Sequence, residues 1–291
     1  MQRSASQDVF RNIQPNPKKH TIMKPPSSKS SNKAINKHGG YIRPNYSFKY
    51  NLMKPKFILF SISIFAMSMV LVHSGNRAFS QDKKEKREVT AFSEISLSIS
   101  ADLYLKQGNE HSLVLEGDED DLEDIETEVR GNELKIQLNR PFNFRSMDRI
   151  RIYVTMKNVD ELSVSGSGKI EAETPIQTSE LTLNLSGSGD INIGELEAKE
   201  VDAQISGSGD IRLAGKSNLE ELEVDITGSG DLHAEDIQAD EADIDISGSG
   251  TCRIHAINEL EVSITGSGKV RYKGNPRVNA NISGSGSVSS Y

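Results

Sequence analysis

Seven copies of one tetrapeptide, Ser/Thr-Gly-Ser-Gly, punctuate the second half of this chain. Successive copies begin 21, 20, 21, 20, 18 and 18 residues apart, at Ser165, Ser186, Ser206, Thr227, Ser247, Thr265 and Ser283. A period near twenty is typical of repeat proteins, in which each unit buries its apolar face only by stacking on its neighbours. The period therefore favours a stack of similar coils over one globular core.

Apolar and polar residues alternate between the tetrapeptides. A long alternation precedes each one, as at Leu181, Leu183 and Leu185, and a shorter one follows, as at Ile191 and Ile193. Alternation with period two predicts strands that have one buried face. Every long stretch stands in the same phase relative to its tetrapeptide, which favours identical coils in register over a meander of hairpins. We therefore predict an all-β fold, in which residues 161–291 form a stacked β-solenoid (β-helix) of about 20-residue coils with Gly-Ser-Gly corners.

Glycine is expected at these corners because a strand that reverses within two or three residues needs positive φ or a close backbone approach. The polar positions of the long strands should then point outward. They form a flat, largely acidic sheet with hardly any aromatic residues, at Thr182, Asn184, Asp202, Gln204, Glu223, Asp225, Asp243, Asp245 and Ser263.

Residues 85–160 have strand patterns without glycine corners, and we expect this N-terminal β region to cap the first coil. The run Val129-Arg-Gly-Asn-Glu-Leu134 predicts a tight hairpin. The expected strands are Glu94–Ser100, Leu103–Lys106, Ser112–Glu116, Thr127–Arg130, Glu133–Asn139 and Arg149–Thr155. A cap is not evident after the last corner, so the final coil should expose a β-edge that can pair with another chain.

The N-terminal part has the features of an export signal. Lys54 and Lys56 precede an apolar run over residues 57–72, and Ala78-Phe79-Ser80 supplies small residues at a cleavage site. We interpret residues 53–80 as a signal peptide. Residues 1–52 then form a basic, disordered leader that reflects an overextended gene start, with Met53 as the true start. The alternative is an uncleaved signal anchor at 57–72. Both readings place the repeats outside the cytoplasm.

Charge and cysteine content narrow the classes of partner. Residues 81–291 carry 21 Lys/Arg against 41 Asp/Glu, which argues against nucleic acid as a partner. The single cysteine, Cys252, excludes a disulfide within the chain and occupies a slot that is aliphatic in other repeats. We expect it to be a small buried side chain.

Few residues point to catalysis or to a cofactor. Asp190, Asp210 and Asp231 follow consecutive corners and should stack in a column about 4.8 Å apart, which makes them weak calcium candidates. Solvated turn acids are the alternative that we favour, because the column breaks at Thr251 and Lys269 and calcium-binding β-rolls have a shorter period. No Cys/His spacing supports zinc and no serine has a base nearby, so we predict no catalytic residue, no metal and no cofactor.

The chain also resembles a known family. Residues 87–95 (REVTAFSEI), Leu103–Gly117, Thr127–Ile136 and the run Leu162-Ser-Val-Ser-Gly-Ser-Gly168 are similar to the family called "putative auto-transporter adhesin, head GIN domain". The resemblance covers roughly residues 85–291. It implies an exported protein with β-helical repeats and a role in surface adhesion, and it implies no catalytic residues.

These observations lead to one functional expectation and two alternatives. We expect a non-catalytic exported protein of the cell surface or envelope, an adhesin head domain that binds a surface or envelope ligand. The first alternative is a periplasmic structural β-solenoid that associates with itself through its C-terminal coil. The second is a glycan-active β-helical enzyme. The membrane should be involved only through the signal or anchor segment.

Overall fold

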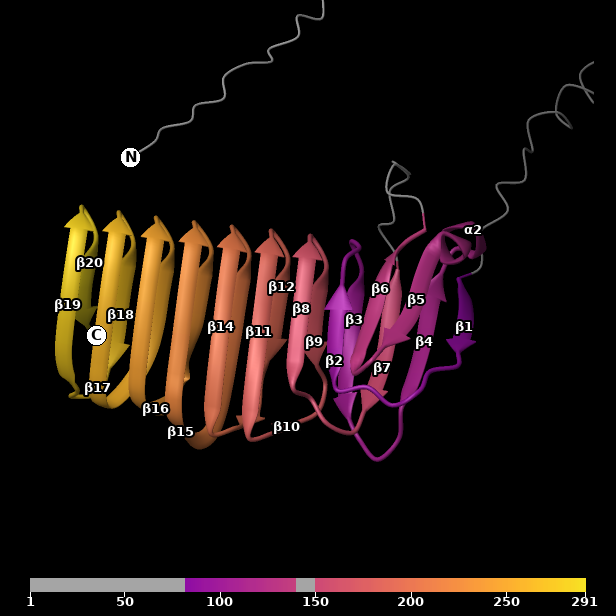
Figure 1. The fold of residues 1–291 in the computed structure, drawn as a ribbon, viewed down its shortest axis with the longest axis horizontal. Coiled ribbons are helices and arrows are strands. Elements are labelled where there is room, and N and C mark those ends of the chain that lie inside the picture. The colour runs from indigo at the N-terminus through magenta and orange to yellow at the C-terminus, as the bar shows by residue number, and fades with distance from the viewer. Residues whose placement is uncertain (1–81, 140–149) are drawn as a thin grey trace, which may run out of the picture. The chain divides into compact units, whose positions relative to one another are not determined.

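The computed structural model describes residues 82–139 and 150–291, and these residues form a stack of β-coils (Figure 1). Our interpretation of residues 1–80 as leader and signal peptide lies outside the described residues. Within the described ranges, no helix is long and apolar enough to cross a membrane. The prediction of an all-β solenoid is confirmed.

Each repeat contributes one long and one short strand, and the strands of successive repeats pair in parallel and in register. The long strands lie on one side of the stack and the short strands on the other. The separate strands are β8 (Glu161–Gly166), β9 (Lys169–Ala172), β11 (Glu180–Gly187), β12 (Asp190–Ile193), β14 (Glu200–Gly207), β18 (Lys269–Lys273), β19 (Arg277–Gly284) and β20 (Ser287–Ser290).

In the middle of the stack, a short strand, its connector and the next long strand form one continuous strand. This occurs in β15 (Asp210–Gly228), β16 (Asp231–Gly248) and β17 (Thr251–Gly266). Gly215 lies inside β15, between its short-strand and long-strand parts. In the structure the backbone continues its ladder through this turn of the coil with a shift of register. Earlier connectors instead carry the short paired strands β10 (Ile176–Gln177) and β13 (Leu196–Glu197).

The N-terminal region contains the predicted strands, with bounds that differ by a few residues. The hairpin at Gly131 is confirmed, because β5 and β6 pair antiparallel around it and Gly131 has φ of 64°. One further strand, β1, was not predicted, and the acidic run Glu116–Glu128 contains a short helix, α2. The strands are β1 (Lys83–Arg87), β2 (Glu94–Leu97), β3 (Asp102–Gln107), β4 (Ser112–Gly117), β5 (Ile125–Arg130), β6 (Glu133–Leu138) and β7 (Arg151–Met156), and α2 spans Glu119–Glu123.

This region supplies coils of its own as well as a cap. Strand β2 pairs in parallel with β6 on one side and with β8 on the other, and β3 pairs in the same way with β7 and β9. The coil formed by β2 and β3 therefore lies between the coil of β6 and β7 and the first Gly-Ser-Gly repeat. The sheet crosses the expected boundary at residue 160 without interruption. The cap itself consists of β1, β4 and β5, which pair antiparallel, together with α2.

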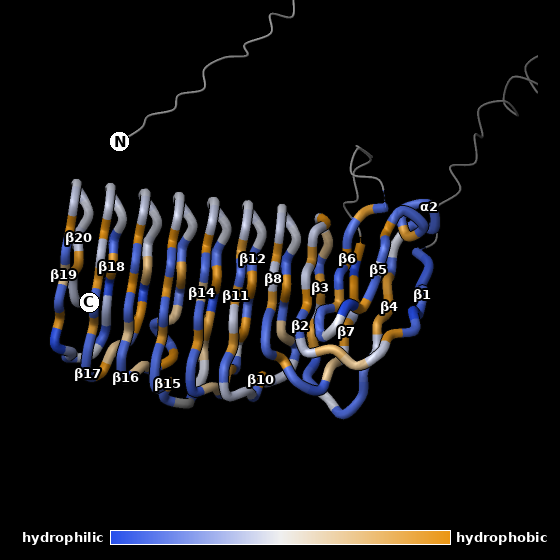
Figure 2. The backbone as a smooth tube through the Cα atoms, in the orientation of Figure 1, coloured by the Kyte–Doolittle hydropathy of each residue, from blue (hydrophilic) through white to orange (hydrophobic). Residues whose placement is uncertain are grey.

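The core is a row of aliphatic side chains between the two sheets. Hydrophobic positions alternate with hydrophilic ones along each strand, as predicted (Figure 2). Leu181, Leu183 and Ile244 are fully buried, and so is Cys252, in agreement with its assignment as a small apolar side chain. Burial also raises the pKa of the Cys252 thiol well above its ordinary value. The described residues include no buried charged or polar side chain, so apolar burial and the backbone ladders stabilise the coils.

The corners require glycine for two reasons. The first glycine of each tetrapeptide has positive φ, for example 140° at Gly248, in agreement with the prediction. From Gly187 onward, a Cβ at this glycine would also overlap the carbonyl oxygen of the equivalent glycine in the preceding coil, which is Gly228 for Gly248. The stack can therefore bring two corners together only where the residue of the later coil lacks a Cβ.

Candidate functional site: the carboxylate face

The outward side chains of the long strands form three straight columns, because the strands pair residue for residue. We call this surface the carboxylate face. The first column is Glu180, Glu200, Glu221, Glu241, Glu259 and Arg277. The second is Glu133, Glu94, Glu161, Thr182, Asp202, Glu223, Asp243, Glu261 and Asn279. The third, beginning at β11, is Asn184, Gln204, Asp225, Asp245, Ser263 and Asn281.

Much of the second and third columns was predicted to point outward, and the structure confirms this. The first column and the extension of the second onto β2 and β6 were not predicted. A signal for the first column was present, since Glu directly precedes the first buried residue of successive long strands, as in Glu200-Val201 and Glu221-Leu222. The extension depends on the position of β2 between β6 and β8, which only the fold shows.

The centre of the carboxylate face has little charge compensation. Among the described residues, Glu223, Asp225, Asp243 and Asp245 form no ion pair, whereas Arg277 pairs with Glu259 at 2.5 Å at the end of the stack. Partial burial, reinforced by neighbouring carboxylates, raises the pKa of Glu223, Asp225 and Asp243. Like charges in neighbouring strands destabilise a sheet, so this arrangement lowers the stability of the fold.

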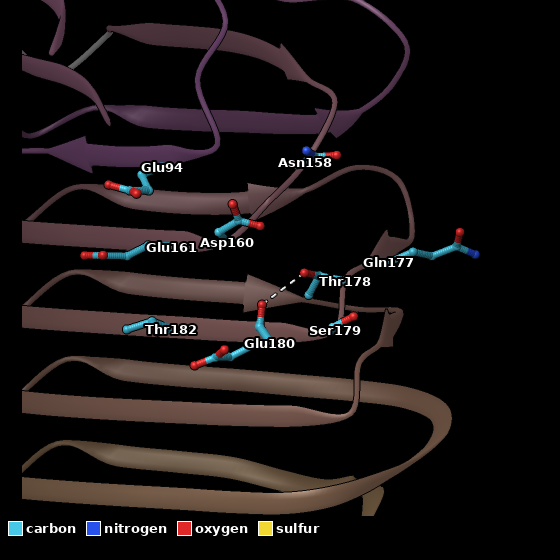
Figure 3. A pocket seen from close by; sticks show the side chains of 9 residues that line it. All are labelled: Glu94, Asn158, Asp160, Glu161, Gln177, Thr178, Ser179, Glu180 and Thr182. Carbon is cyan, nitrogen blue, oxygen red and sulfur yellow. Dashed lines mark hydrogen bonds between the residues drawn. The ribbon is translucent and has the colours of Figure 1, made fainter. Parts of the chain in front are cut away.

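Two grooves lie on this face. One, of about 640 Å³, opens beside β2 and the first Gly-Ser-Gly repeats (Figure 3). It is lined by Glu94, Asp160, Glu161 and Glu180 together with Asn158, Gln177, Thr178, Ser179 and Thr182. Burial, together with Glu161, Glu133 and Asp160, raises the pKa of Glu94. The other groove, of about 340 Å³, lies over β16, β17 and β19 and includes Asp243, Asp245 and Glu261. Both grooves are therefore acidic hollows in an otherwise flat sheet.

The calcium candidates lie on the opposite side, the short-strand face. Asp190, Asp210 and Asp231 stack in register, as the sequence predicted. Two of these carboxylates already have hydrogen-bond partners. Asp210 accepts a hydrogen bond from Arg212 at 2.7 Å, and Asp231 accepts one from the Thr251 amide at 2.9 Å. Within residues 82–139 and 150–291, no group of three or more His, Cys, Asp or Glu side chains is arranged to hold a metal ion. The assignment of Asp190, Asp210 and Asp231 as solvated turn acids stays a prediction.

The short-strand face also carries an aromatic pair that the sequence analysis did not single out. Tyr104 of β3 and Tyr153 of β7 stack with their ring centroids 5.4 Å apart, and Lys84 lies over the Tyr153 ring. The Tyr153 hydroxyl donates a hydrogen bond to Glu116 at 2.8 Å. Each tyrosine lies between two aliphatic residues of its strand, which was the available signal. The pair joins two neighbouring coils, and the contacts of Tyr153 with Lys84 of β1 and Glu116 of β4 tie the cap to the stack.

The repulsion between charges on the carboxylate face predicts the direction in which substitutions there change stability. We expect Asp225→Asn with Asp243→Asn to raise the free energy of unfolding at pH 7, by about 0.5 kcal/mol or less for each site, because the exposed like charges repel only weakly. The pKa of each aspartate is higher in the folded protein than in the unfolded protein, so protonation of these groups stabilises the fold. This stabilisation is fully present below the unfolded-state pKa of aspartate, 3.8, and is lost as the pH rises through the folded-state pKa. The advantage of the variant should therefore shrink as pH falls from 7 towards 4.

Urea unfolding followed by circular dichroism at pH 7 and pH 4 measures this difference. Asp210→Asn with Asp231→Asn provides the matched control. It removes the same charge from carboxylates that have partners, so it should lower stability at pH 7. A gain in both variants would show that net charge, and not the uncompensated columns, sets the effect.

Comparison with known families identifies the chain. Residues 91–276 match the family described as "Putative auto-transporter adhesin, head GIN domain". The chain belongs to this family. The expected resemblance is thereby confirmed, and the match runs from just before β2 to the connector between β18 and β19. No curated protein matches the chain.

Solved structures share the fold of this head GIN domain. An adhesin-like protein of Bacteroides fragilis, titled a "putative adhesin", is 21% identical, with a TM-score of 0.68 over 72% of this chain and 97% of that chain. A "putative adhesin" of Parabacteroides merdae is 22% identical, with a TM-score of 0.59 over 73% and 97%. A Parabacteroides distasonis protein titled a "putative lipid binding protein" is 26% identical, with a TM-score of 0.59 over 73% and 98%. These proteins carry the same β-solenoid architecture.

Proposed function

We propose that this protein is an exported, non-catalytic adhesin head that contacts cationic groups of a surface or envelope ligand through the carboxylate face. The observation that carries the proposal is the set of uncompensated carboxylates at Glu223, Asp225, Asp243 and Asp245. Their mutual repulsion lowers stability, and departures from the most stable pattern are concentrated at functional sites. Membership of a family named for adhesion supports the same conclusion.

The geometry suits a ligand with repeated positive charges. Neighbouring coils place equivalent carboxylates about 4.8 Å apart, so a chain of cationic groups can meet several coils at once. Each contact is weak because it is exposed, and many weak contacts made together give avidity. A flat, repeated face suits this kind of binding better than it suits a reaction, which needs converging acid and base groups.

Binding to a surface coated with polylysine tests the face. The triple variant Asp225→Asn, Asp243→Asn, Asp245→Asn should bind at least about tenfold more weakly than the wild type, measured by surface plasmon resonance, since several of its contacts are lost together. The triple variant Asp190→Asn, Asp210→Asn, Asp231→Asn loses the same charge from the short-strand face and should bind nearly as well as the wild type. Equal losses would contradict a specific role for the carboxylate face.

Export is part of the proposal and rests on the signal features at 53–80. Protease shaving of intact cells, followed by mass spectrometry, should release peptides from residues 81–291, and the mature N-terminus should be Gln81. Protection until the outer membrane is broken would contradict adhesion and favour the periplasmic structural alternative. The non-catalytic assignment would be contradicted by a hydrolase or lyase activity that one Asp→Asn substitution abolishes.

A further inference from the structure

The two ends of the described stack differ in how they are covered. At the N-terminal end, the outermost strand β1 pairs with β4 and carries Lys83, Lys84 and Lys86, and α2 lies beside β4 and β5. Arg87 fixes this cover, since its guanidinium donates to the carbonyl oxygens of Ile125 at 2.7 Å and Leu122 at 2.8 Å. Charged residues and a covering helix are the usual means of blocking a β-edge. This end is therefore protected from pairing with another chain.

The last described coil, β19 and β20, has no comparable cover. Val278 is 39% exposed and Ile282 is 40% exposed, whereas Leu260 and Ile264, which occupy the same positions one coil earlier, are 0% and 1% exposed. The large hydrophobic side chains exposed in the described chain are Val278, Ile282 and Tyr291, and all belong to this end. An apolar row beside an unpaired backbone edge is a site for another β-strand.

The outward residues of this coil also lack the charges that the long strands before it carry. Where inner coils have pairs such as Glu223 with Asp225, or Asp243 with Asp245, β19 has Asn279 and Asn281. The edge strand carries one charged side chain, Arg277, which already pairs with Glu259. As in β11, which has Thr182 and Asn184 there, the terminal coil has no charge at the positions where charge would oppose pairing between identical strands.

The sequence of β19 is complementary to itself when two copies run antiparallel. With Ala280 opposite its own equivalent, Val278 faces Ile282, Asn279 faces Asn281 and Arg277 faces Ser283. Apolar residues then lie over apolar residues, and the two amides can donate and accept hydrogen bonds. If two copies of the strand around Val224 were paired in the same antiparallel way, Glu223 of one copy would face Asp225 of the other. A two-fold symmetric contact uses one patch on both partners, and such a patch is present here.

We propose that two copies of this chain associate end to end through β19 and β20, with the β19 strands paired antiparallel about Ala280. The product is a closed dimer and not a filament, because the N-terminal ends of both copies are protected. The dimer is a solenoid of doubled length whose carboxylate columns continue only up to the uncharged joint. This inference does not depend on the proposed adhesin function.

Sedimentation equilibrium of the full chain over a range of concentrations tests the proposal. We expect the wild type to reach twice the monomer mass and no more. Asn279→Glu with Asn281→Asp restores the inner-coil pattern and places like charges across the joint, which should raise the dimer dissociation constant about a hundredfold or more. Inner coils carry these same residues, so the variant should fold, and an unchanged thermal transition by circular dichroism would establish that it does.

Thr182→Glu with Gln204→Glu is the matched control. It adds the same two negative charges to the carboxylate face away from the joint and should leave the dimer intact. A wild type that stays monomeric at every concentration, a double Asn279/Asn281 variant that still dimerises, or growth beyond two copies would each overturn the proposal.

The register has its own test. Ala280→Cys should form a disulfide-linked dimer on mild oxidation, because the two cysteines face each other across the symmetry axis. The native Cys252 is buried and should not contribute. Asn192→Cys, on the short-strand face far from the joint, should stay monomeric under the same oxidation on a non-reducing gel. Equal crosslinking of both variants would contradict pairing about Ala280.

Discussion

Ile244→Asp should abolish cooperative folding of the central coils. Ile244 is fully buried, between Val224 and Val262 of the neighbouring coils. Its replacement loses about 1.5–3 kcal/mol of apolar burial. It also carries a carboxylate into a core without a polar partner, at a further cost of several kcal/mol. The sum approaches the whole stability of an ordinary domain, which is about 5–15 kcal/mol.

Loss of the urea transition, or its displacement to much lower urea, would be the expected readout by circular dichroism. The neighbouring outward residue gives the control, because Asp243→Ala removes a side chain that makes no ion pair in the described chain and should change stability by less than about 0.5 kcal/mol. Similar losses from the two substitutions would show that the assignment of inward and outward positions is wrong.

Gly248→Ala is expected to have the second largest effect, a loss of about 3–5 kcal/mol. The alanine must adopt φ near 140°, which is strained for any residue other than glycine. Its Cβ also overlaps the Gly228 carbonyl oxygen, so the two coils must move apart. The backbone strain and the displacement of the coils are separate costs of the same substitution, so they add.

Two other glycines separate these contributions. Gly166 has φ of 111°, but a Cβ there would meet no atom within 4 Å, so Gly166→Ala should show the backbone strain alone, about 1–3 kcal/mol. Gly194 has neither constraint, and Gly194→Ala should be neutral or slightly stabilising. Denaturation of the three variants in parallel measures the series. Equal costs at Gly166 and Gly248 would show that contact between corners contributes little to the stack.

Much of the repeat region followed from the sequence because its constraints are local and periodic. Alternation fixed which side chains enter the core, as at Ile244, and the constant phase of each corner fixed the parallel register. The acidic surface and the hairpin at Gly131 followed from the same local patterns.

The arrangement around the cap could not be predicted, since an alternating pattern states which face of a strand is buried but not which strand lies beside it. Only the tertiary structure placed β2 between β6 and β8, joined Glu133 and Glu94 to the second carboxylate column, and stacked Tyr104 on Tyr153. These are contacts between segments far apart in the chain.

The sequence by itself therefore determined the coil, its buried and exposed faces and its glycine corners, because backbone geometry and burial act within one repeat. Only the tertiary structure decided that the coil of β2 and β3 lies between the coil of β6 and β7 and the first repeat, and so which carboxylates extend the second column, because both depend on the order in which coils stack. That order is set by the packing of whole strands and leaves no periodic trace in the sequence.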